Sequence, residues 1–228
     1  MSEALSVLAP ELSLDRILWW QSDGMPDVRM QVQRLYYANW QAPTELGKDG
    51  GHCATPRSIL RVTRQSLLRA WVPSPAEPGV VLFVKRRGNL MRGRLQGEQQ
   101  LRSVLVDSVK QLPVNLVVKD FDGSASPKKT VKLFARSQVV VGLHGGGLAN
   151  ILFAPEGAQL FEIGFTSPFA GHYRHLAATL GVVVTLIPVA SDPRGIGASD
   201  VSLADPEGAG KLLHTALQQM ADKDASKH

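Results

Sequence analysis

VVVGLHGGGLANILFAPEG, at residues 139–157, is the stretch that decides the fold of this chain. A run of β-branched residues ends in a glycine-rich turn, and the turn opens a short apolar helix. This order predicts a strand, a tight loop and a helix N-terminus. Backbone N–H groups can converge on an anion in such a loop, because glycine has no Cβ and the helix dipole favours negative charge. His144 follows the strand directly, where the ligands of open α/β sheets bind.

The same alternation of strand and helix continues on both sides of this stretch. We expect strands at residues 80–85, 114–118, 139–142, 159–163 and 182–188, and helices at 98–112, 126–137, 149–153, 168–180 and 206–221. The first strand is a continuous apolar run, which is typical of strands buried on both faces. Strands that alternate with helices predict right-handed βαβ units. The sequence therefore predicts an α/β fold with a Rossmann-like, doubly wound parallel sheet.

Composition divides the chain into four expected regions. They are a partial N-terminal region at 1–54, a junction helix with a proline-rich linker at 55–78, the Rossmann-like domain at 79–221 and a disordered tail at 222–228. Thr55 is the expected N-cap of the junction helix. Its expected apolar stripe is Leu60, Leu67, Leu68 and Trp71, and the face expected to meet solvent carries Arg57, Arg61 and Arg64.

The central motif is also similar to a family signature. The runs Gly142–Asn150, Phe153–Gly157 and Phe161–Ile163 resemble, in this order, the signature of glycosyltransferase family 61, and the resemblance extends over roughly residues 55–190. It implies a domain like the C-terminal, nucleotide-sugar-binding half of a GT-B enzyme. The implied reaction is inverting transfer of a sugar, expected to be UDP-linked, to a hydroxyl of a glycan or protein acceptor. No cofactor or metal ion and no nucleic acid partner is implied.

The resemblance further implies which residues bind the nucleotide sugar. Arg86 and Arg87 follow the first strand, where the family often has Ser-Arg-Arg, and a guanidinium can hold phosphate oxygens bidentately. The other expected ligands are His144, Gly145, Gly146, Gly147, Asn150 and Glu162. His144 would give the diphosphate a hydrogen bond or a positive charge, and Glu162 would accept ribose hydroxyls. Two positions depart from the family: Lys85 replaces a serine, and Ala149 replaces Thr or Ser and so lacks a hydroxyl.

Each of these candidates also has a purely structural explanation. His144 could hydrogen-bond a backbone carbonyl in the core, and the three glycines could serve only a tight turn and close helix packing. The arginines could form a solvated basic turn. Glu162 and Asn150 could cap neighbouring helices.

Other function classes remain open on the sequence. Asp120 and Asp122 spell the Asp-x-Asp pattern of metal-binding GT-A enzymes, although the following Gly-Ser favours a turn. The run His144–Gly147 matches an esterase oxyanion motif, but the chain has no Gly-x-Ser-x-Gly elbow. The basic helix could contact nucleic acid, but it lacks interleaved aromatic residues. An inactive nucleotide-binding remnant is the main alternative to the transferase, and the catalytic base stays unassigned among Asp23, Asp27 and His52.

Charge and targeting signals constrain the partners only loosely. The net charge of +5 suits a phosphate-bearing ligand or an acidic polymer, but equally a solvated basic surface. Cys53 is the single cysteine, so no intrachain disulfide can form. Residues 1–11 lack the basic start of a signal peptide, and no run reaches the ~20 apolar residues of a membrane span. The family resemblance implies a Golgi or ER lumen location, although no signal or anchor is visible in the sequence.

Overall fold

The computed structural model describes residues 7–8, 57–72, 79–86, 94–164, 171–190 and 200–225. Within these ranges, helices and strands alternate along the chain as the sequence predicts. The elements in chain order are α2 (Arg57–Trp71), β1 (Val80–Val84), α3 (Glu98–Lys110), β2 (Val117–Phe121), α4 (Pro127–Ala135), β3 (Ser137–Leu143), the 3₁₀ helix η3 (Gly146–Phe153), β4 (Gln159–Gly164), α5 (His172–Thr179), β5 (Val183–Pro188) and α6 (Pro206–Ala225).

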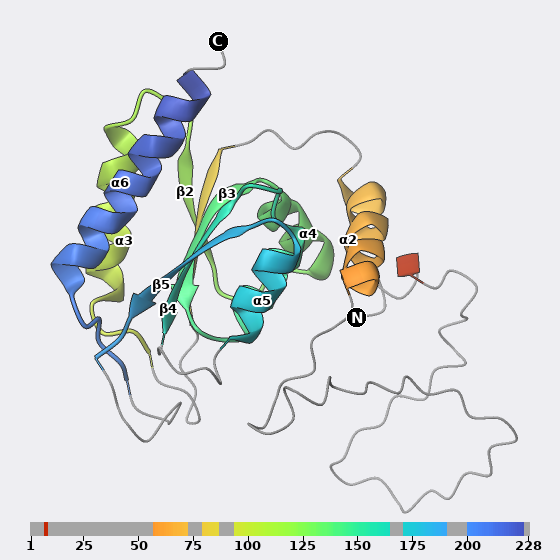
Figure 1. Cartoon of the computed structure of the whole chain (residues 1–228), viewed down its shortest axis with the longest axis horizontal. Coiled ribbons are helices and arrows are strands. Elements are labelled where there is room, and N and C mark those ends of the chain that lie inside the picture. Colours follow the sequence, from red (N-terminus) through yellow and green to blue (C-terminus); the bar gives the residue numbers. More distant parts are fainter. Residues whose placement is uncertain are drawn as a thin grey trace, which may run out of the picture.

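The five strands form one parallel sheet in the order β2-β1-β3-β4-β5 (Figure 1). From β1 the chain crosses to β2 on one side, and from β3 it proceeds to β4 and β5 on the other. The direction of winding therefore changes between β1 and β3. This order is one of the two common arrangements of doubly wound sheets. The predicted α/β, Rossmann-like doubly wound fold is confirmed.

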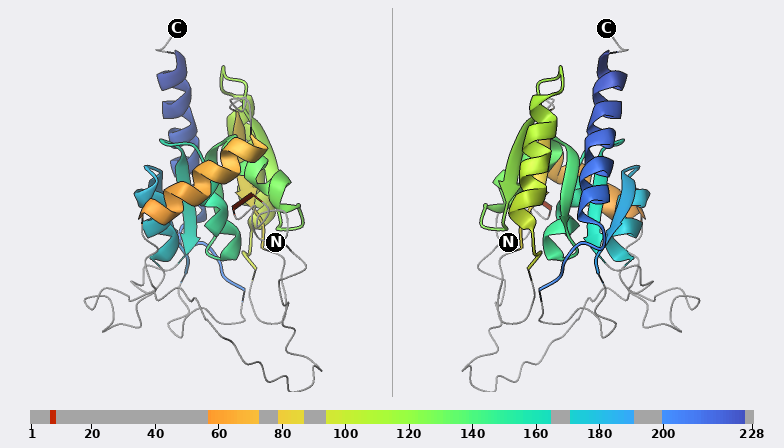
Figure 2. Two further views of the ribbon diagram at one scale, coloured as in Figure 1. Left: turned by 90° about the vertical axis from the view of Figure 1, so that its right-hand side faces the viewer. Right: turned by 90° about the vertical axis from the view of Figure 1, so that its left-hand side faces the viewer.

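Helices cover both faces of the sheet, with α3 and α6 on one side and α2, α4, η3 and α5 on the other (Figures 1 and 2). Successive residues of a strand point to opposite faces. Accordingly, Val81 and Phe83 join the core beneath α3 and α6, whereas Val80, Leu82 and Val84 join the core beneath the other helices. Burial on both faces explains why β1 consists only of apolar residues.

The second strand lies three residues later than the sequence predicts. We expected residues 114–118, but β2 spans Val117–Phe121, with Val80 opposite Val117 and Val84 opposite Phe121. Among the described strands, β2 is an edge strand that pairs with β1 alone. Because none of these strands lies on its other side, it accommodates Lys119 and Asp120, both exposed. Hydrophobicity alone therefore places this strand incorrectly.

The start of α4 agrees with the prediction, whereas the end of α6 and the start of η3 differ from it. α4 begins as predicted, with Pro127 in its first turn and the Ser126 hydroxyl accepting from the backbone N–H of Lys129 at 3.5 Å. α6 continues to Ala225, so the expectation of a disordered tail from residue 222 is wrong for its first four residues. The helix after the glycine turn is a 3₁₀ helix and already begins at Gly146.

Arg64 does not lie on the solvent face of α2, contrary to the expectation from the sequence. Its Nη2 donates to the carbonyl of Ala154 at 2.9 Å, and so ties α2 to the end of η3. Burial lowers the pKa of the Arg64 guanidinium below its usual value, although the nearby Glu156 opposes this shift. Leu67 and Trp71 anchor the same helix in the core, as predicted. The proposed cap Thr55 and the linker at 73–78 lie outside the described residues.

No helix within the described ranges combines the length and the apolar character that crossing a membrane requires.

Candidate functional site

The point where the winding direction changes lies at the carboxyl ends of β1 and β3. Val84 is the last residue of β1 and pairs with Gly142, next to the last residue of β3. Lys85 and Arg86 leave β1 there, and residues 144–147 leave β3. Ligands of open α/β sheets bind at this kind of switch point. The fold therefore brings two of the predicted motifs together.

Arg86 lies directly against the glycine-rich turn. A Cβ at Gly145 would lie 3.1 Å from Nη2 and 3.3 Å from Nε of Arg86, so a larger residue here would require the guanidinium to move by a few tenths of an ångström. The arginine and the turn thus form one cationic, hydrogen-bonding surface. Arg87, the second predicted arginine, lies outside the described residues.

The glycines of the motif differ in what they pack against. A Cβ at Gly142 would lie 2.7 Å from Val84 Cβ, and one at Gly147 would lie 2.9 Å from Val84 Cγ1. These two glycines allow the turn to pack closely on β1. Close packing is the structural role that the sequence also allowed for the glycines of the motif. A Cβ at Gly146 would have no atom within 4 Å, and this residue is exposed. Packing therefore accounts for Gly142 and Gly147 but not for Gly146.

His144 forms a buried pair with Glu162, which follows it by 18 residues in the sequence. His144 Nδ1 lies 2.5 Å from Glu162 Oε1, and the residues are 7% and 1% exposed. The backbone N–H of His144 donates to the carbonyl of Ile163 at 2.7 Å. The Tyr173 ring packs on the imidazole with a centroid distance of 5.0 Å. Glu162 thus holds the histidine, and its predicted contact with ribose hydroxyls stays a prediction.

Arg174 was not predicted from the sequence, but it belongs to the same group of residues as His144 and Glu162. Its Nε lies 3.5 Å from Glu162 Oε2, and its side chain is 29% exposed. The first turn of α5 contains Arg174 and no acidic residue. A helix dipole disfavours a cation in the first turn. An arginine at this position is therefore the feature of the sequence that could have indicated a functional residue.

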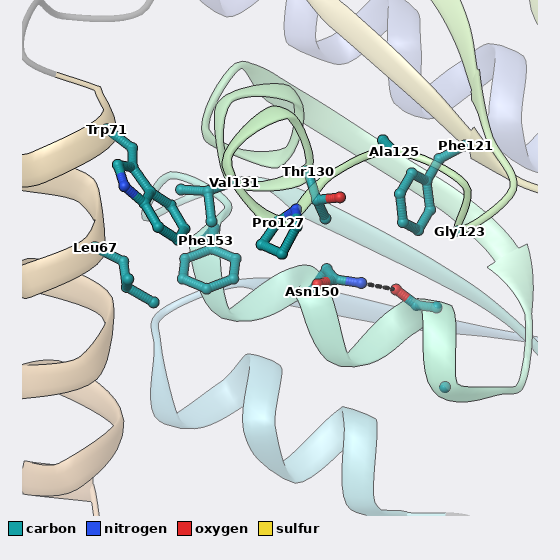
Figure 3. A pocket seen from close by; sticks show the side chains of 12 residues that line it. Leu67, Trp71, Phe121, Gly123, Ala125, Pro127, Thr130, Val131, Asn150 and Phe153 are labelled. Carbon is teal, nitrogen blue, oxygen red and sulfur yellow. Dashed lines mark hydrogen bonds between the residues drawn. The ribbon is translucent and has the colours of Figure 1, made fainter. Parts of the chain in front are cut away.

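Asn150 stabilises the turn from within η3. Its Nδ2 donates to the carbonyl of Gly147 at 3.0 Å, as Figure 3 shows. The residue also lines a hollow of about 430 Å³ between α2, α4 and η3. The walls of this hollow are Leu67, Trp71, Phe121, Gly123, Ala125, Pro127, Thr130, Val131, Gly146, Gly147, Asn150 and Phe153. These side chains are mainly apolar and largely buried in the core, so the hollow offers a ligand little besides the exposed turn.

A second hollow, of about 360 Å³, adjoins the arginine. It is lined by Arg86, Arg94, Leu95 and residues 97–100, the start of α3. Arg86 therefore borders both the glycine turn and a more polar recess, whose lining includes a second arginine and also the carboxylate of Glu98. The two surfaces together are large enough for a small anionic ligand.

The two aspartates of the Asp-x-Asp pattern are engaged within the chain. Asp120 pairs with Lys85 Nζ at 2.8 Å and with Arg102 Nε at 2.7 Å. Asp122 Oδ1 accepts from the backbone N–H and the hydroxyl of Ser124, which is the geometry of a turn. In the part of the chain that the structure describes, no three His, Cys, Asp or Glu side chains gather as a metal site.

The ion pairs of Asp120 predict a specific dependence of stability on pH. Partial burial acts to raise the pKa of Asp120, but hydrogen bonds and charge from Arg102 and Lys85 outweigh it and lower the pKa. Compared with Asp120→Asn, the wild type should be more stable at pH 7 by less than about 1 kcal/mol, as for other exposed pairs. The difference should persist above the unfolded pKa of about 3.9 and vanish as the pH falls through the folded pKa. Urea unfolding from pH 7 to 2 measures it, and a difference that grows in acid would contradict the assignment.

The chain was compared with known proteins and with protein-family models. The diflavin flavoprotein A3 from Nostoc sp. matches with a TM-score of 0.43 and 16% identity, over 67% of this chain and 99% of that one. A variant of the flavo di-iron protein from Thermotoga maritima matches with a TM-score of 0.40 and 12% identity, over 72% of this chain and 40% of that one. No curated protein matches the sequence. The family model named Glycosyltransferase 61 matches residues 2–161, which extends the similarity into the N-terminal region. The chain belongs to glycosyltransferase family 61.

Proposed function

We propose that this chain binds a UDP-linked sugar at the carboxyl ends of β1 and β3 and transfers the sugar, with inversion, to an acceptor hydroxyl. Membership of the family implies a glycosyltransferase whose substrates are a nucleotide-sugar donor and an acceptor. The contact of Arg86 with Gly145 at the switch point carries the proposal. A guanidinium beside a glycine-rich turn, in which Gly146 is exposed, is suited to hold a diphosphate.

The proposed roles follow from the position of each residue. Arg86 holds phosphate oxygens bidentately, and Arg87 is proposed as a second guanidinium. The backbone of Gly145, Gly146 and Gly147 supplies N–H donors. His144 adds a hydrogen bond or a positive charge, while Asn150 keeps the turn in shape through its bond to Gly147. Each of these groups acts on the diphosphate or on the turn that holds it.

The proposed reaction is an in-line displacement. The acceptor oxygen attacks the anomeric carbon from the side opposite the diphosphate, and the bond from this carbon to the diphosphate oxygen breaks. A general base takes the acceptor proton. Negative charge develops on the leaving diphosphate, where Arg86 and His144 stabilise it in place of a metal ion. In a GT-B arrangement the base belongs to the N-terminal half, and the candidates Asp23, Asp27 and His52 lie outside the described residues.

One observation supports a second candidate, a protein that binds the nucleotide but does not transfer the sugar. Ala149 is exposed in the first part of η3, where the family signature has a hydroxyl residue. A missing hydroxyl removes one hydrogen bond to the donor. Release of UDP from UDP-sugars in the presence of acceptor would support the transferase, and UDP binding without release would support the second candidate. For either candidate we propose a Golgi or ER lumen location, as the family implies.

Calorimetric titration with UDP and GDP, first without metal and then with Mn²⁺, tests the proposed site. We expect UDP to bind without metal, and His144→Ala to bind it about tenfold more weakly, as for the loss of one hydrogen bond to a charged group. His214→Ala is the matched control, because His214 pairs with Ser108 between α3 and α6 at 3.1 Å. Failure of the wild-type chain to bind either nucleotide would contradict the proposal.

A further inference from the structure

Glu162 lies between two cationic or hydrogen-bond-donating side chains at the carboxyl edge of the sheet. Its Oε1 meets His144 Nδ1 at 2.5 Å, and Arg174 Nε lies 3.5 Å from its Oε2. Within the described part of the chain, Oε2 accepts no hydrogen bond, although the residue is only 1% exposed. A buried carboxylate needs partners for both oxygens. The second oxygen is therefore poised for Arg174, which needs to approach by only a few tenths of an ångström.

The two partners of Glu162 belong to different structural elements, and their contacts with Glu162 connect these elements. His144 leaves β3, Glu162 belongs to β4, and Arg174 lies in the first turn of α5. Tyr173, next to Arg174, packs on the His144 ring. A carboxylate that holds both side chains fixes the position of α5 relative to the glycine turn as well as the orientation of the imidazole.

We propose that Glu162 is a positioning residue that orients His144 and Arg174 toward the donor diphosphate, and that Arg174 is a further diphosphate-binding residue. This inference rests on the proposed function, because it assumes a diphosphate beside the glycine turn. Arg174 is suited to the role, since it is partly exposed and lies 3.5 Å from Glu162, which stands opposite Gly142 near the carboxyl end of β3. In this role Glu162 acts on the diphosphate through the other two side chains.

The direction in which Glu162→Gln changes the affinity for UDP distinguishes a positioning role from a simple effect of charge. Removing a negative charge near an anion site strengthens anion binding if only charge matters. If Glu162 positions the cations, Glu162→Gln should instead weaken UDP binding by about tenfold, the size found when an outer partner of a ligating side chain is lost. Asp120→Asn is the matched control, because it also removes a carboxylate paired with two cations near the carboxyl end of a strand, here β2. It should leave the UDP affinity unchanged or raise it.

A spectroscopic measurement on the ligand-free protein tests the His144–Glu162 pair directly. We expect His144 Nδ1 to donate the hydrogen bond to Glu162, because an imidazole held through a donated hydrogen bond carries its proton on that nitrogen. Two-bond ¹H–¹⁵N spectra of the wild-type chain should show a protonated Nδ1 for His144, assigned by its loss in His144→Gln. Glu162→Gln should change this pattern, and Asp120→Asn should not. An unprotonated Nδ1 in the wild type would overturn the positioning role.

Arg174→Met provides a second variant that should fold, because the side chain is partly exposed and its stem is retained. We expect about tenfold weaker UDP binding, as for loss of one charged hydrogen bond, while Arg69→Met on the exposed face of α2 should bind normally. In a His144→Gln, Arg174→Met background, Glu162→Gln should have no further effect on UDP affinity. Normal UDP binding by Arg174→Met, or tighter binding by Glu162→Gln, would overturn this inference alone. Absence of UDP binding by the wild type would overturn the proposed function as well.

Discussion

Arg86→Ala is expected to raise the dissociation constant for UDP about 100-fold, since two charge-assisted hydrogen bonds to phosphate are lost together. The guanidinium lies against Gly145, beside the proposed diphosphate site. A planar guanidinium can bind two phosphate oxygens at once, so its loss should cost more than the loss of a single point charge. Metal-free calorimetry with the full chain measures the change.

Lys85→Ala is the matched control for this experiment. It removes the same charge from the neighbouring position, but Lys85 Nζ is already paired with Asp120 at 2.8 Å. We expect at most about a threefold loss of UDP affinity, as for a screened charge that does not contact the ligand. Equal losses in the two variants would show that only net charge matters. An unchanged affinity in Arg86→Ala would remove the main support for the proposed donor site.

The meeting of Arg86 with the glycine turn could be predicted from the sequence. Both segments follow apolar strands that are buried on both faces, and the carboxyl ends of parallel strands meet at one edge of the sheet. The pattern of Val80–Val84 and of Val139–Val141 is strong because both strands are central. Burial on two faces leaves little freedom in residue type, and so the sequence specifies these strands well.

The network around Glu162 could not be predicted in the same way. Its geometry depends on the parallel register that sets Gly142 opposite Glu162 and on where α5 begins, neither of which the spacing of residues determines. Arg64 shows the same limitation, because an arginine in an amphipathic helix can meet solvent or, as here, the carbonyl at the end of η3. At the sheet edge, β2 tolerates polar residues and its hydrophobic pattern is correspondingly weak. Long-range partners, and not local preference, decide these positions.

Gly142→Ala is expected to lower the free energy of unfolding by about 1–3 kcal/mol, the usual range for overpacking a tightly packed core. The new methyl group would lie 2.7 Å from Val84 Cβ and 3.1 Å from both Val84 O and Leu148 Cδ2. Gly142 sits in β3 between β1 and β4, which pair with it on both sides, so the backbone cannot move aside without disturbing the sheet.

Gly146→Ala supplies the control with the opposite expected sign. Its Cβ would meet nothing within 4 Å, and its φ is not positive, so the substitution should be neutral or raise stability by up to about 1 kcal/mol through the unfolded chain. Urea unfolding followed by circular dichroism compares the two variants with the wild type. Because a displaced Val84 carries Arg86 with it, Gly142→Ala should also weaken UDP binding. Equal stability of the Gly142→Ala and Gly146→Ala variants would mean that close packing of β3 on β1 does not require a glycine at position 142.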